Sequence, residues 1–297
     1  MPAPDGVVPQ RPALAIKVDN YRSARPQSGL NDADIVFEEP VEGDTTRLVA
    51  VFQCEDAAMV GDIRSARAVD PLVLDQLSTP LFVHVGGIAP VLSLIRQADA
   101  IDEGIQARGY PVQNPTDRVA PYDTYVSTAA AWGLRTDDTQ PPAPVFTYSE
   151  TPLPARPVTT LHIPYSATND ATWTWDPGGR RWMLSYSGVP AMLADGGQIS
   201  AADVVVEVVK VTYGPWTEDG RLGLEVQSQL IGAGPLVVFR DGLEIAGTWQ
   251  HASTDSPARL VALDGTPIAL QVGETWVEIV PSTVTVTTTG PTSTPSA

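Results

Sequence analysis

A proline-rich stretch near the middle of the chain separates two regions whose sequence patterns differ. Residues 137–158, DDTQPPAPVFTYSETPLPARPV, hold six prolines and show little periodicity, as is typical of an extended, semi-rigid linker. Short apolar runs alternate with helical patterns before this stretch, whereas strand patterns follow one another after it. The sequence therefore predicts two unlike domains, and a length of 297 residues also suits two domains of ordinary size.

The first region alternates strand-like and helical segments. Four short runs rich in β-branched or aromatic residues predict strands, and these are ALAIKV (13–18), DIVFEE (34–39), RLVAVFQ (47–53) and LFVHV (81–85). Apolar residues recur at helical spacing within 68–77 and 88–98, which predicts two helices. Because strands alternate with helices, we expect an N-terminal α/β layered domain over 12–138.

The second region, 161–281, carries strand patterns and tight turns. The segment WTWDPGGRRWML (173–184) alternates aromatic residues on both sides of a Pro-Gly-Gly turn, which predicts a hairpin. Further strand-like runs occupy 203–213, 222–227, 235–249, 259–270 and 274–281, two of them bent at Asp241-Gly242 and Asp264-Gly265. This spacing predicts a mostly antiparallel C-terminal β domain, so the expected fold class of the whole chain is α+β or α/β.

Segments of low complexity flank these two regions. We expect residues 1–11 to form a flexible tether, 139–160 to form the linker, and 282–297 to form a disordered tail rich in Thr, Ser and Pro. The start, MPAPDGVVPQRP, has neither the charged nor the apolar region of a signal peptide, so none is expected within it. No apolar run approaches the roughly 18 residues that a membrane-spanning helix needs.

Composition argues against several functional classes. The formal net charge is −17 and the isoelectric point is near 4.4, which disfavours a nucleic-acid-binding protein, because phosphate contacts need a basic face. A single cysteine, Cys54, excludes an internal disulfide and a Cys-rich zinc site, and we expect a buried structural thiol. The histidines His84, His162 and His251 are far apart in sequence, so we predict no bound metal and no cofactor.

Arginines gather in the first region although the chain is acidic. Arg64 and Arg67 lie in VGDIRSARAVD, where a strand pattern gives way to a helical one. If Ser65 caps that helix, both guanidiniums meet its positive end and form a site for phosphate, pyrophosphate or carboxylate. The alternative is that both arginines pair with Asp62 and Asp70 as ordinary surface charges.

A second basic segment precedes this one. Arg22 and Arg25 in DNYRSARPQSGL repeat the Arg-Ser-Ala-Arg tetrapeptide of residues 64–67, and Arg47 opens a strand. If these segments meet in space, the five arginines form one basic mouth in an acidic protein. Coincidence in a chain rich in Ala and Arg is the alternative.

Several acidic side chains and one histidine are weak candidates for catalysis. Asp19, Glu38, Glu39, Glu42 and Asp44 follow or end strands in the first region. Paired carboxylates can act as general acid and base or bind a hard metal ion, but their spacing matches no known metal loop, so solvated surface charges are the stronger interpretation. His84 ends a strand before two glycines, where it could face a cleft.

Several segments together resemble the YerB-like lipoproteins, a bacterial family of unassigned activity. The resemblance rests on KVDNYRSARPQSGLNDADIVFEEPVEGDTTRLVAVFQ, VGDIRSARAVD, LFVHVGG, VTYGPW, PLVVFRDGLEIAGTW and GETWVEIVP, and it covers nearly all of 11–281. It implies two domains, a signal peptide and lipid-modified cysteine that this chain does not include, and a location outside the cytoplasm on the cell membrane. The family often has Pro-His-Asn where this chain has Pro121-Tyr122-Asp123, and a basic residue where it has Gln250, which disfavours a histidine-dependent hydrolysis.

A weaker, fold-level likeness bears on the ligand. The order of RLVAVFQ, an arginine-bearing turn, VHVGG and a helix resembles the LytR-CpsA-Psr cell-wall ligases, which hold a polyprenyl pyrophosphate with arginines. Such a likeness does not specify a reaction.

The leading hypothesis is an envelope binding module rather than an enzyme. It would take a phosphorylated or pyrophosphorylated cell-wall intermediate on Arg64 and Arg67, with help from Arg25, Arg47 and Arg22. One alternative is a cell-wall phosphotransferase or glycan-acting enzyme that uses Asp19 or Glu38 beside the arginines. Another is a scaffold that binds an envelope protein through its β domain.

Overall fold

The computed structural model describes residues 6–104, 112–115, 117–135, 139–218, 220, 222–254 and 256–291. The N-terminal half contains the strands β1 (Leu14–Asp19), β2 (Ile35–Val41), β3 (Thr45–Phe52), β4 (Val60–Gly61), β5 (Leu81–His84), β6 (Ile101–Gly104) and β7 (Tyr125–Val126). Its helices are short: η2 (Leu30–Asp32), α1 (Asp70–Leu74), η3 (Asp75–Leu77), α2 (Ala89–Ile95) and α4 (Thr128–Trp132). The strands and helices predicted for this half are present, each shifted by a few residues at its ends.

The C-terminal half is built of strands, and the fold as a whole is mostly β. They are β8 (Arg156–Pro157), β9 (Thr160–Pro164), β10 (Asp170–Asp176), β11 (Arg181–Tyr186), β12 (Val189–Pro190), β13 (Ser200–Ala201), β14 (Asp203–Val209), β15 (Val211–Tyr213), β16 (Val226–Ser228), β17 (Gly232–Arg240), β18 (Leu243–His251), β19 (Arg259–Ala262), β20 (Thr275–Pro281) and β21 (Thr287–Thr289). The aromatic hairpin forms as β10 and β11, and Asp241-Gly242 turns the chain between β17 and β18, with positive φ at both residues.

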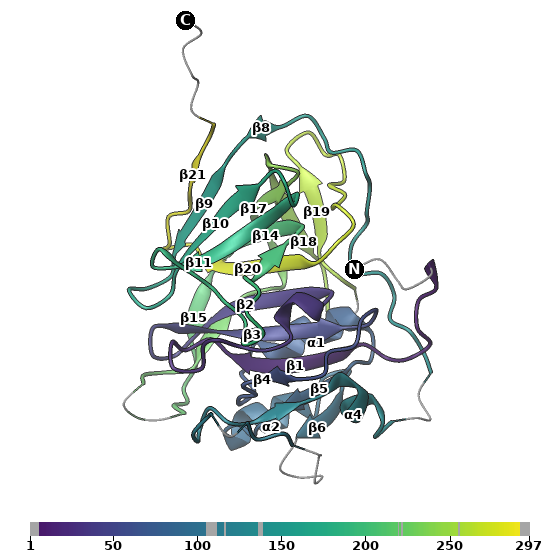
Figure 1. The fold of residues 1–297 in the computed structure, drawn as a ribbon, viewed down its shortest axis with the longest axis vertical. Coiled ribbons are helices and arrows are strands. Elements are labelled where there is room, and N and C mark those ends of the chain that lie inside the picture. The colour runs from purple at the N-terminus through teal and green to yellow at the C-terminus, as the bar shows by residue number, and fades with distance from the viewer. Residues whose placement is uncertain are drawn as a thin grey trace, which may run out of the picture.

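One mixed sheet runs through both halves of the molecule. Its strand order is β19-β18-β17-β14-β20-β2-β3-β1-β5-β6, and Figure 1 shows it passing from the C-terminal strands at the top to β5 and β6 at the bottom. The joining strand is β20, which pairs in parallel with β14 on one side and with β2 on the other. The two halves therefore share one sheet, because β20 of the C-terminal half pairs directly with β2 of the N-terminal half.

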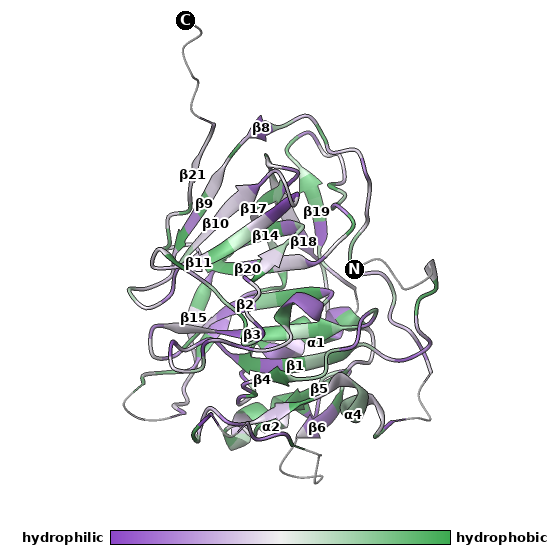
Figure 2. Ribbon diagram, viewed as in Figure 1, coloured by the Kyte–Doolittle hydropathy of each residue, from purple (hydrophilic) through white to green (hydrophobic). Residues whose placement is uncertain are grey.

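The two faces of this sheet are covered by different elements. On one face, α1 and α2 pack with Val73, Leu74, Val91 and Ile95 against the sheet. On the other face, a second sheet of order β12-β11-β10-β9-β21 packs through buried tryptophans such as Trp173 and Trp182. Apolar residues concentrate in the central strands between these layers (Figure 2). Trp173, Trp182 and Trp249 are buried core residues.

Three expectations for the loops and ends need correction. The predicted linker 139–160 is not a free spacer, because Phe146 is buried in the core and β8 pairs with β18. The predicted disordered tail contains β21, which pairs with β9, while residues 292–297 lie outside the described part of the chain. Arg11, at the end of the predicted tether, lies over the Trp132 ring at 3.3 Å. In the part of the chain that the structure describes, no helix has both the length and the apolar composition to span a bilayer.

Candidate functional site

Strand register places a row of charged residues on the helix-covered face of the sheet. Asp19 on β1 and Glu39 on β2 both lie directly opposite Arg47 on β3. Because residues directly opposite each other in an antiparallel pair share a face, these three side chains form a continuous row at the end of the strands. All three residues are buried. Of the carboxylates predicted to be solvated surface charges, Asp19, Glu38, Glu39 and Glu42 are therefore core residues, and only Asp44 is exposed.

The tetrapeptide at 64–67 contacts this row through Asp19 and Arg47. Both of its arginines are paired with acids. Arg67 is buried and donates through Nε to Glu42 Oε2 at 2.9 Å, through Nη2 to the other oxygen of Glu42, and through Nη1 to Glu218 at 2.9 Å. Arg64 Nε lies 2.9 Å from Asp19 Oδ2. The acids that neutralise these guanidiniums come from β1, the β2–β3 turn and the distant 214–225 loop, not from Asp62 and Asp70.

Ser65 does not cap the following helix. The residue before α1 is Val69, whose side chain makes no capping hydrogen bond, and Pro71 lies in the first turn of the helix. Proline has no backbone N–H, and backbone N–H groups in the first turn have no partner within the helix, so proline is tolerated there. Asp70 instead accepts a hydrogen bond from the Arg67 amide at 2.6 Å. The prediction that Ser65 caps a helix whose N-terminus lies beside both arginines is therefore wrong, because α1 begins only at Asp70.

Arg47 lies near both Arg64 and Arg67 and forms no ion pair with a described carboxylate within 4 Å. Its Nη1 donates to Ser65 O at 2.8 Å. Burial lowers the pKa of Arg47 to about 10, and the nearby Arg67 guanidinium adds to this effect. The row is completed by Lys17, which is fully buried between Glu39 and Asp70. Burial raises the pKa of the Glu39 carboxyl to about 8 despite the lysine.

The tetrapeptide at 22–25 has a different environment. Arg25 donates through Nε to Asn20 Oδ1 at 3.2 Å, and through Nη2 to Asn20 O at 2.8 Å and Asn169 Oδ1 at 3.0 Å. Its guanidinium lies 3.6 Å from the centroid of the Tyr186 ring. Within the described residues Arg25 has no carboxylate within 4 Å, and its Nη1 makes none of these bonds. Arg22 is exposed.

Arg25 lines a pocket of about 260 Å³ on the surface. The other lining residues are Pro26, Gln27, Tyr186, Val189, Pro190, Ala191 and Met192. Val189 and Met192 form an exposed apolar rim, with 66% and 42% of their surface accessible. The pocket therefore combines one fixed cation with an apolar wall.

Glu38 lies on the opposite face of the sheet from Arg64 and Arg67. In the parallel pairing of β2 with β20 it is the direct neighbour of Glu278, and both carboxyls are fully buried. Glu38 accepts hydrogen bonds from the side chains of Asn20, Thr46, Tyr186 and Trp276. Glu278 contacts Trp173 Nε1 at 2.7 Å and Tyr165 Oη at 3.0 Å. Burial raises the pKa of both carboxyls, and the Glu38 charge adds to the rise at Glu278.

His84 is not exposed to solvent, whereas the sequence suggested that it could face a cleft. It is buried, its Nδ1 lies 2.8 Å from Gly86 O, and its Nε2 lies 2.9 Å from Asp102 Oδ1. Both ring nitrogens are thus engaged in fixing the end of β5. Cys54 is half-buried, and burial raises the pKa of its thiol to about 11. Among the described residues, no three acidic, histidine or cysteine side chains are grouped closely enough to hold a metal ion.

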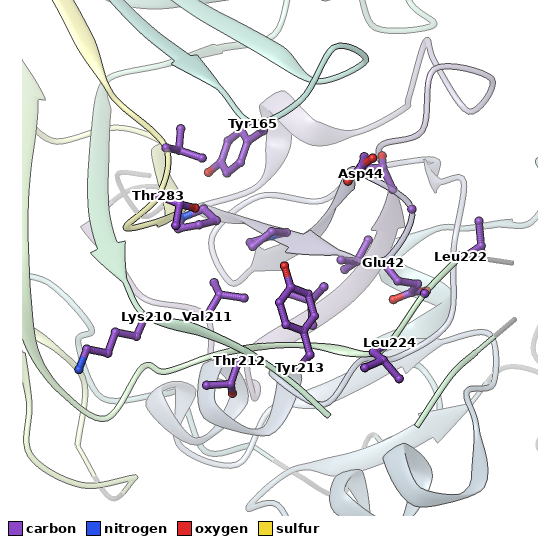
Figure 3. Close-up of a pocket in the computed structure, with 18 of the residues that line it drawn as sticks. Glu42, Asp44, Tyr165, Lys210, Val211, Thr212, Tyr213, Leu222, Leu224 and Thr283 are labelled. Carbon is purple, nitrogen blue, oxygen red and sulfur yellow. The ribbon is translucent and has the colours of Figure 1, made fainter. Parts of the chain in front are cut away.

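A larger cavity, of about 450 Å³, lies where the two halves meet. Its walls are the β2–β3 turn, the segment from Lys210 to Tyr213, the loop around Leu222 and Leu224, and residues 281–284 after β20. Figure 3 shows Tyr165 and Tyr213 entering it from opposite sides. Tyr213, Leu222 and Leu224 are 68%, 49% and 46% exposed, so this cavity presents more apolar surface than the Arg25 pocket.

The two halves of the chain match two models of a single family. Residues 1–140 match the N-terminal domain and residues 161–277 match the C-terminal domain of a protein family of unknown function, DUF3048. The chain belongs to the DUF3048 family. The first match ends at residue 140 and the second begins at residue 161, so the boundary between them coincides with the proline-rich segment.

One bacterial protein is similar to this chain both in sequence and in its crystal structure. "Putative lipoprotein YerB" of Bacillus subtilis (strain 168) is 27% identical over 285 residues, which cover 92% of this chain and 82% of that protein. The crystal structure of YerB protein from Bacillus subtilis matches with a TM-score of 0.79 at 22% sequence identity, over 93% of this chain and 94% of that one. The YerB-like family membership predicted from sequence is confirmed, as is the two-domain, YerB-like architecture.

Sequence reasoning did not find Glu218, Glu278 or Tyr186. Glu218 and Tyr186 lie in the C-terminal half, and nothing in a single sequence shows that they contact the arginines of the N-terminal half. Glu278 carried a usable signal, because it is the lone acid in the apolar run TWVEIVP (275–281), and a charged residue inside a buried strand requires a polar partner.

Proposed function

We propose that this protein is a binding protein of the bacterial envelope, held as a lipoprotein at the outer face of the cell membrane, and that it binds an anionic group of its ligand on Arg25. The name of the Bacillus subtilis relative supports the lipoprotein location. The observation that carries the binding proposal is the state of the Arg25 side chain, which is fixed by neutral partners and has no acid within 4 Å among the described residues.

This state suits anion binding for two reasons. A guanidinium held by Asn20, Asn169 and the Tyr186 ring loses little further conformational freedom when a ligand arrives. No carboxylate of a described residue lies within 4 Å of it, and the buried Glu38 carboxyl interacts with it only at longer range, so it can form the charge-assisted hydrogen bonds that arginine makes with phosphate or carboxylate oxygens. Arg64 and Arg67 would first have to leave Asp19, Glu42 and Glu218, at the cost of leaving those acids unpaired.

The shape of the pocket adds a second property of the ligand. Val189, Pro190 and Met192 line it next to Arg25, so a ligand that carries an apolar chain beside its phosphate buries more surface there than a free phosphate does. This combination suits a lipid-linked cell-wall intermediate such as a polyprenyl pyrophosphate. Neither Asp19 nor Glu38 lines the pocket, and for this reason we propose binding rather than a phosphotransferase or glycan-acting reaction.

The test is a thermal-shift titration with a short-chain polyprenyl pyrophosphate and, in parallel, with inorganic pyrophosphate. A ligand at a hundredfold excess over its Kd adds about 2.7 kcal/mol of stability, which raises the Tm of a chain of this size by about 5–10 °C. We expect the prenylated ligand to give this shift and Arg25→Gln to remove it. Arg22→Gln, in the same tetrapeptide, is the matched control and should keep it. An equal shift in Arg25→Gln and wild type would refute the assignment.

A further inference from the structure

Within the described part of the chain, the short strand β15 has one unpaired edge. Its one partner strand there is β16, in the antiparallel register Val211 to Ser228, Thr212 to Gln227 and Tyr213 to Val226. The Gly214 amide donates to Glu225 O and the Gln229 amide donates to Lys210 O. These two bonds fix the alternation of the ladder, because hydrogen-bonded pairs recur at every second residue of an antiparallel strand.

The alternation directs the backbone groups of two residues away from β16. Residues 210, 212 and 214 face β16, so the N–H and C=O groups of Val211 and Tyr213 point to the other side. Neither residue makes a backbone hydrogen bond to a described residue on that side. Unpaired edge groups of this kind are a template for the main chain of another segment.

Both residues line the 450 Å³ cavity, which opens because two neighbouring strands diverge. The parallel pairing of β14 with β20 ends at Val209 and Pro281, and the Ser282 amide donates to Val209 O. Beyond this point one chain continues into β15 and the other turns through 282–284. The space between them is bounded by Tyr165 and Tyr213, and by Leu222 and Leu224 at one end (Figure 3).

We propose that an extended peptide segment of a partner protein binds in this cavity and adds a strand to the free edge of β15. The backbone groups of Val211 and Tyr213 supply the hydrogen bonds, and the apolar side chains of Tyr213, Leu222 and Leu224 cover alternate side chains of the peptide. This mode of binding obtains affinity from the main chain and specificity from the pockets beside it.

The charges around the cavity specify the peptide further. Glu42 is neutralised by Arg67, whereas Asp44 is exposed and forms no ion pair within 4 Å of a described residue. Asp44 lies at the same end of the cavity as Leu222, and Lys210 lies at the other end (Figure 3). In a chain of net charge −17, a basic residue of the peptide therefore lies beside Asp44.

The probe is a fluorescein-labelled hexapeptide, Lys-Val-Thr-Val-Thr-Val with blocked ends, and the readout is fluorescence anisotropy. We expect saturable binding that weakens at least fivefold when alternate amides of the peptide are N-methylated, because N-methylation removes edge hydrogen bonds worth about 1 kcal/mol each. A peptide with Glu in place of Lys should bind more weakly, and Asp44→Asn should reduce that difference. Absence of binding by all these peptides at millimolar concentration would overturn the proposal.

Two variants at one position separate edge pairing from folding. Val211→Pro removes an N–H that the β15–β16 ladder does not use, and Val211→Ala keeps it. We expect Val211→Ala to bind the hexapeptide like wild type and Val211→Pro to bind at least fivefold more weakly, with both variants unfolding at similar urea concentrations. Equal affinity in the two variants would exclude β15 as the docking edge. The Arg25 pocket takes no part in this assay, so its outcome is independent of the proposed anion binding.

Discussion

The two Arg-Ser-Ala-Arg segments have the same four residues and opposite environments. In residues 64–67 both arginines are held by acids, with Arg67 buried against Glu42 and Glu218. In residues 22–25 the first arginine is exposed, and the second is held by two asparagines and the Tyr186 ring beside a pocket. The difference comes from distant segments, since the β2–β3 turn brings Glu42 to one copy and β11 brings Tyr186 to the other.

This difference separates two uses of arginine in one protein. A buried arginine with carboxylate partners joins elements of the fold, and removing it leaves unpaired buried charge. A half-buried arginine with neutral partners keeps its charge available to a ligand. We therefore propose a structural role for the second copy and a binding role for the first.

The largest expected effect is the loss of stability in Arg67→Ala. This change leaves Glu42 buried without its guanidinium, which typically costs about 3–5 kcal/mol. Arg25→Ala loses hydrogen bonds to neutral groups, a ring contact and the longer-range attraction to Glu38, for about 1–2 kcal/mol. Urea denaturation of both variants measures the loss in free energy of unfolding. Equal losses in Arg67→Ala and Arg25→Ala would contradict the different roles given to the two tetrapeptides.

The second expected effect is on pH dependence and concerns Asp62, beside Arg64. Burial raises the pKa of the Asp62 carboxyl to about 7 from its ordinary value of 3.8. The folded protein therefore retains a proton that the unfolded chain releases near pH 4, so the free energy of unfolding falls as pH rises from about 4 through 7. Asp62→Asn cannot ionise and should flatten this slope.

Urea denaturation at about pH 5 and about pH 8 tests that prediction. Burial also raises the pKa of Glu39 and of Asp203 to about 8 and that of Glu207 to about 7, so part of the slope should remain in Asp62→Asn. A decrease in stability between the two pH values as large as that of wild type would contradict the assignment of Asp62 as a protonated group.

A smaller effect separates the two roles of Tyr186. Its ring lies under Arg25, and its hydroxyl donates to Glu38 at 3.0 Å. Tyr186→Phe keeps the ring and removes the hydroxyl, so Glu38 loses one of its four hydrogen bonds and Asn20 loses one acceptor. The change should cost about 1–3 kcal/mol of stability and leave pyrophosphate binding unchanged. Loss of pyrophosphate binding in this variant would show that the hydroxyl, and not only the ring, is needed to position Arg25.

The smallest expected effect belongs to Arg22→Ala. An exposed side chain without fixed partners contributes within about 0.5 kcal/mol, so the Tm of this variant should match wild type. A larger loss, measured in the same denaturation series, would place Arg22 in the fold rather than on the surface.

Much of the local structure could be predicted from the sequence, because strands and helices carry local signals. The alternation in 173–184 predicted the β10–β11 hairpin, and Asp241-Gly242 predicted the turn before β18. The order of strands could not be predicted in the same way. The run 274–281 identifies a strand, and its nearly continuous apolar character suits a central parallel strand, but nothing local shows that β20 lies between β14 and β2.

The site was harder to predict, since it depends on contacts between the two halves. The sequence singled out the five arginines and Glu38, but it could not show which arginines the acids neutralise. Glu218 reaches Arg67 from 151 residues away, and Asn169 reaches Arg25 from 144 residues away. Helix capping by Ser65 was expected from local pattern alone and is absent, because α1 begins later, at Asp70.

Calorimetric titration of inorganic pyrophosphate into Arg25→Gln and Arg64→Gln tests the central claim most directly. Both variants lose one positive charge, so a general electrostatic effect would weaken binding equally in the two. We predict that Arg64→Gln binds pyrophosphate with nearly the affinity of wild type and that Arg25→Gln shows no measurable binding. The reverse result, with binding retained in Arg25→Gln and lost in Arg64→Gln, would place the anion site at the second tetrapeptide and contradict the account.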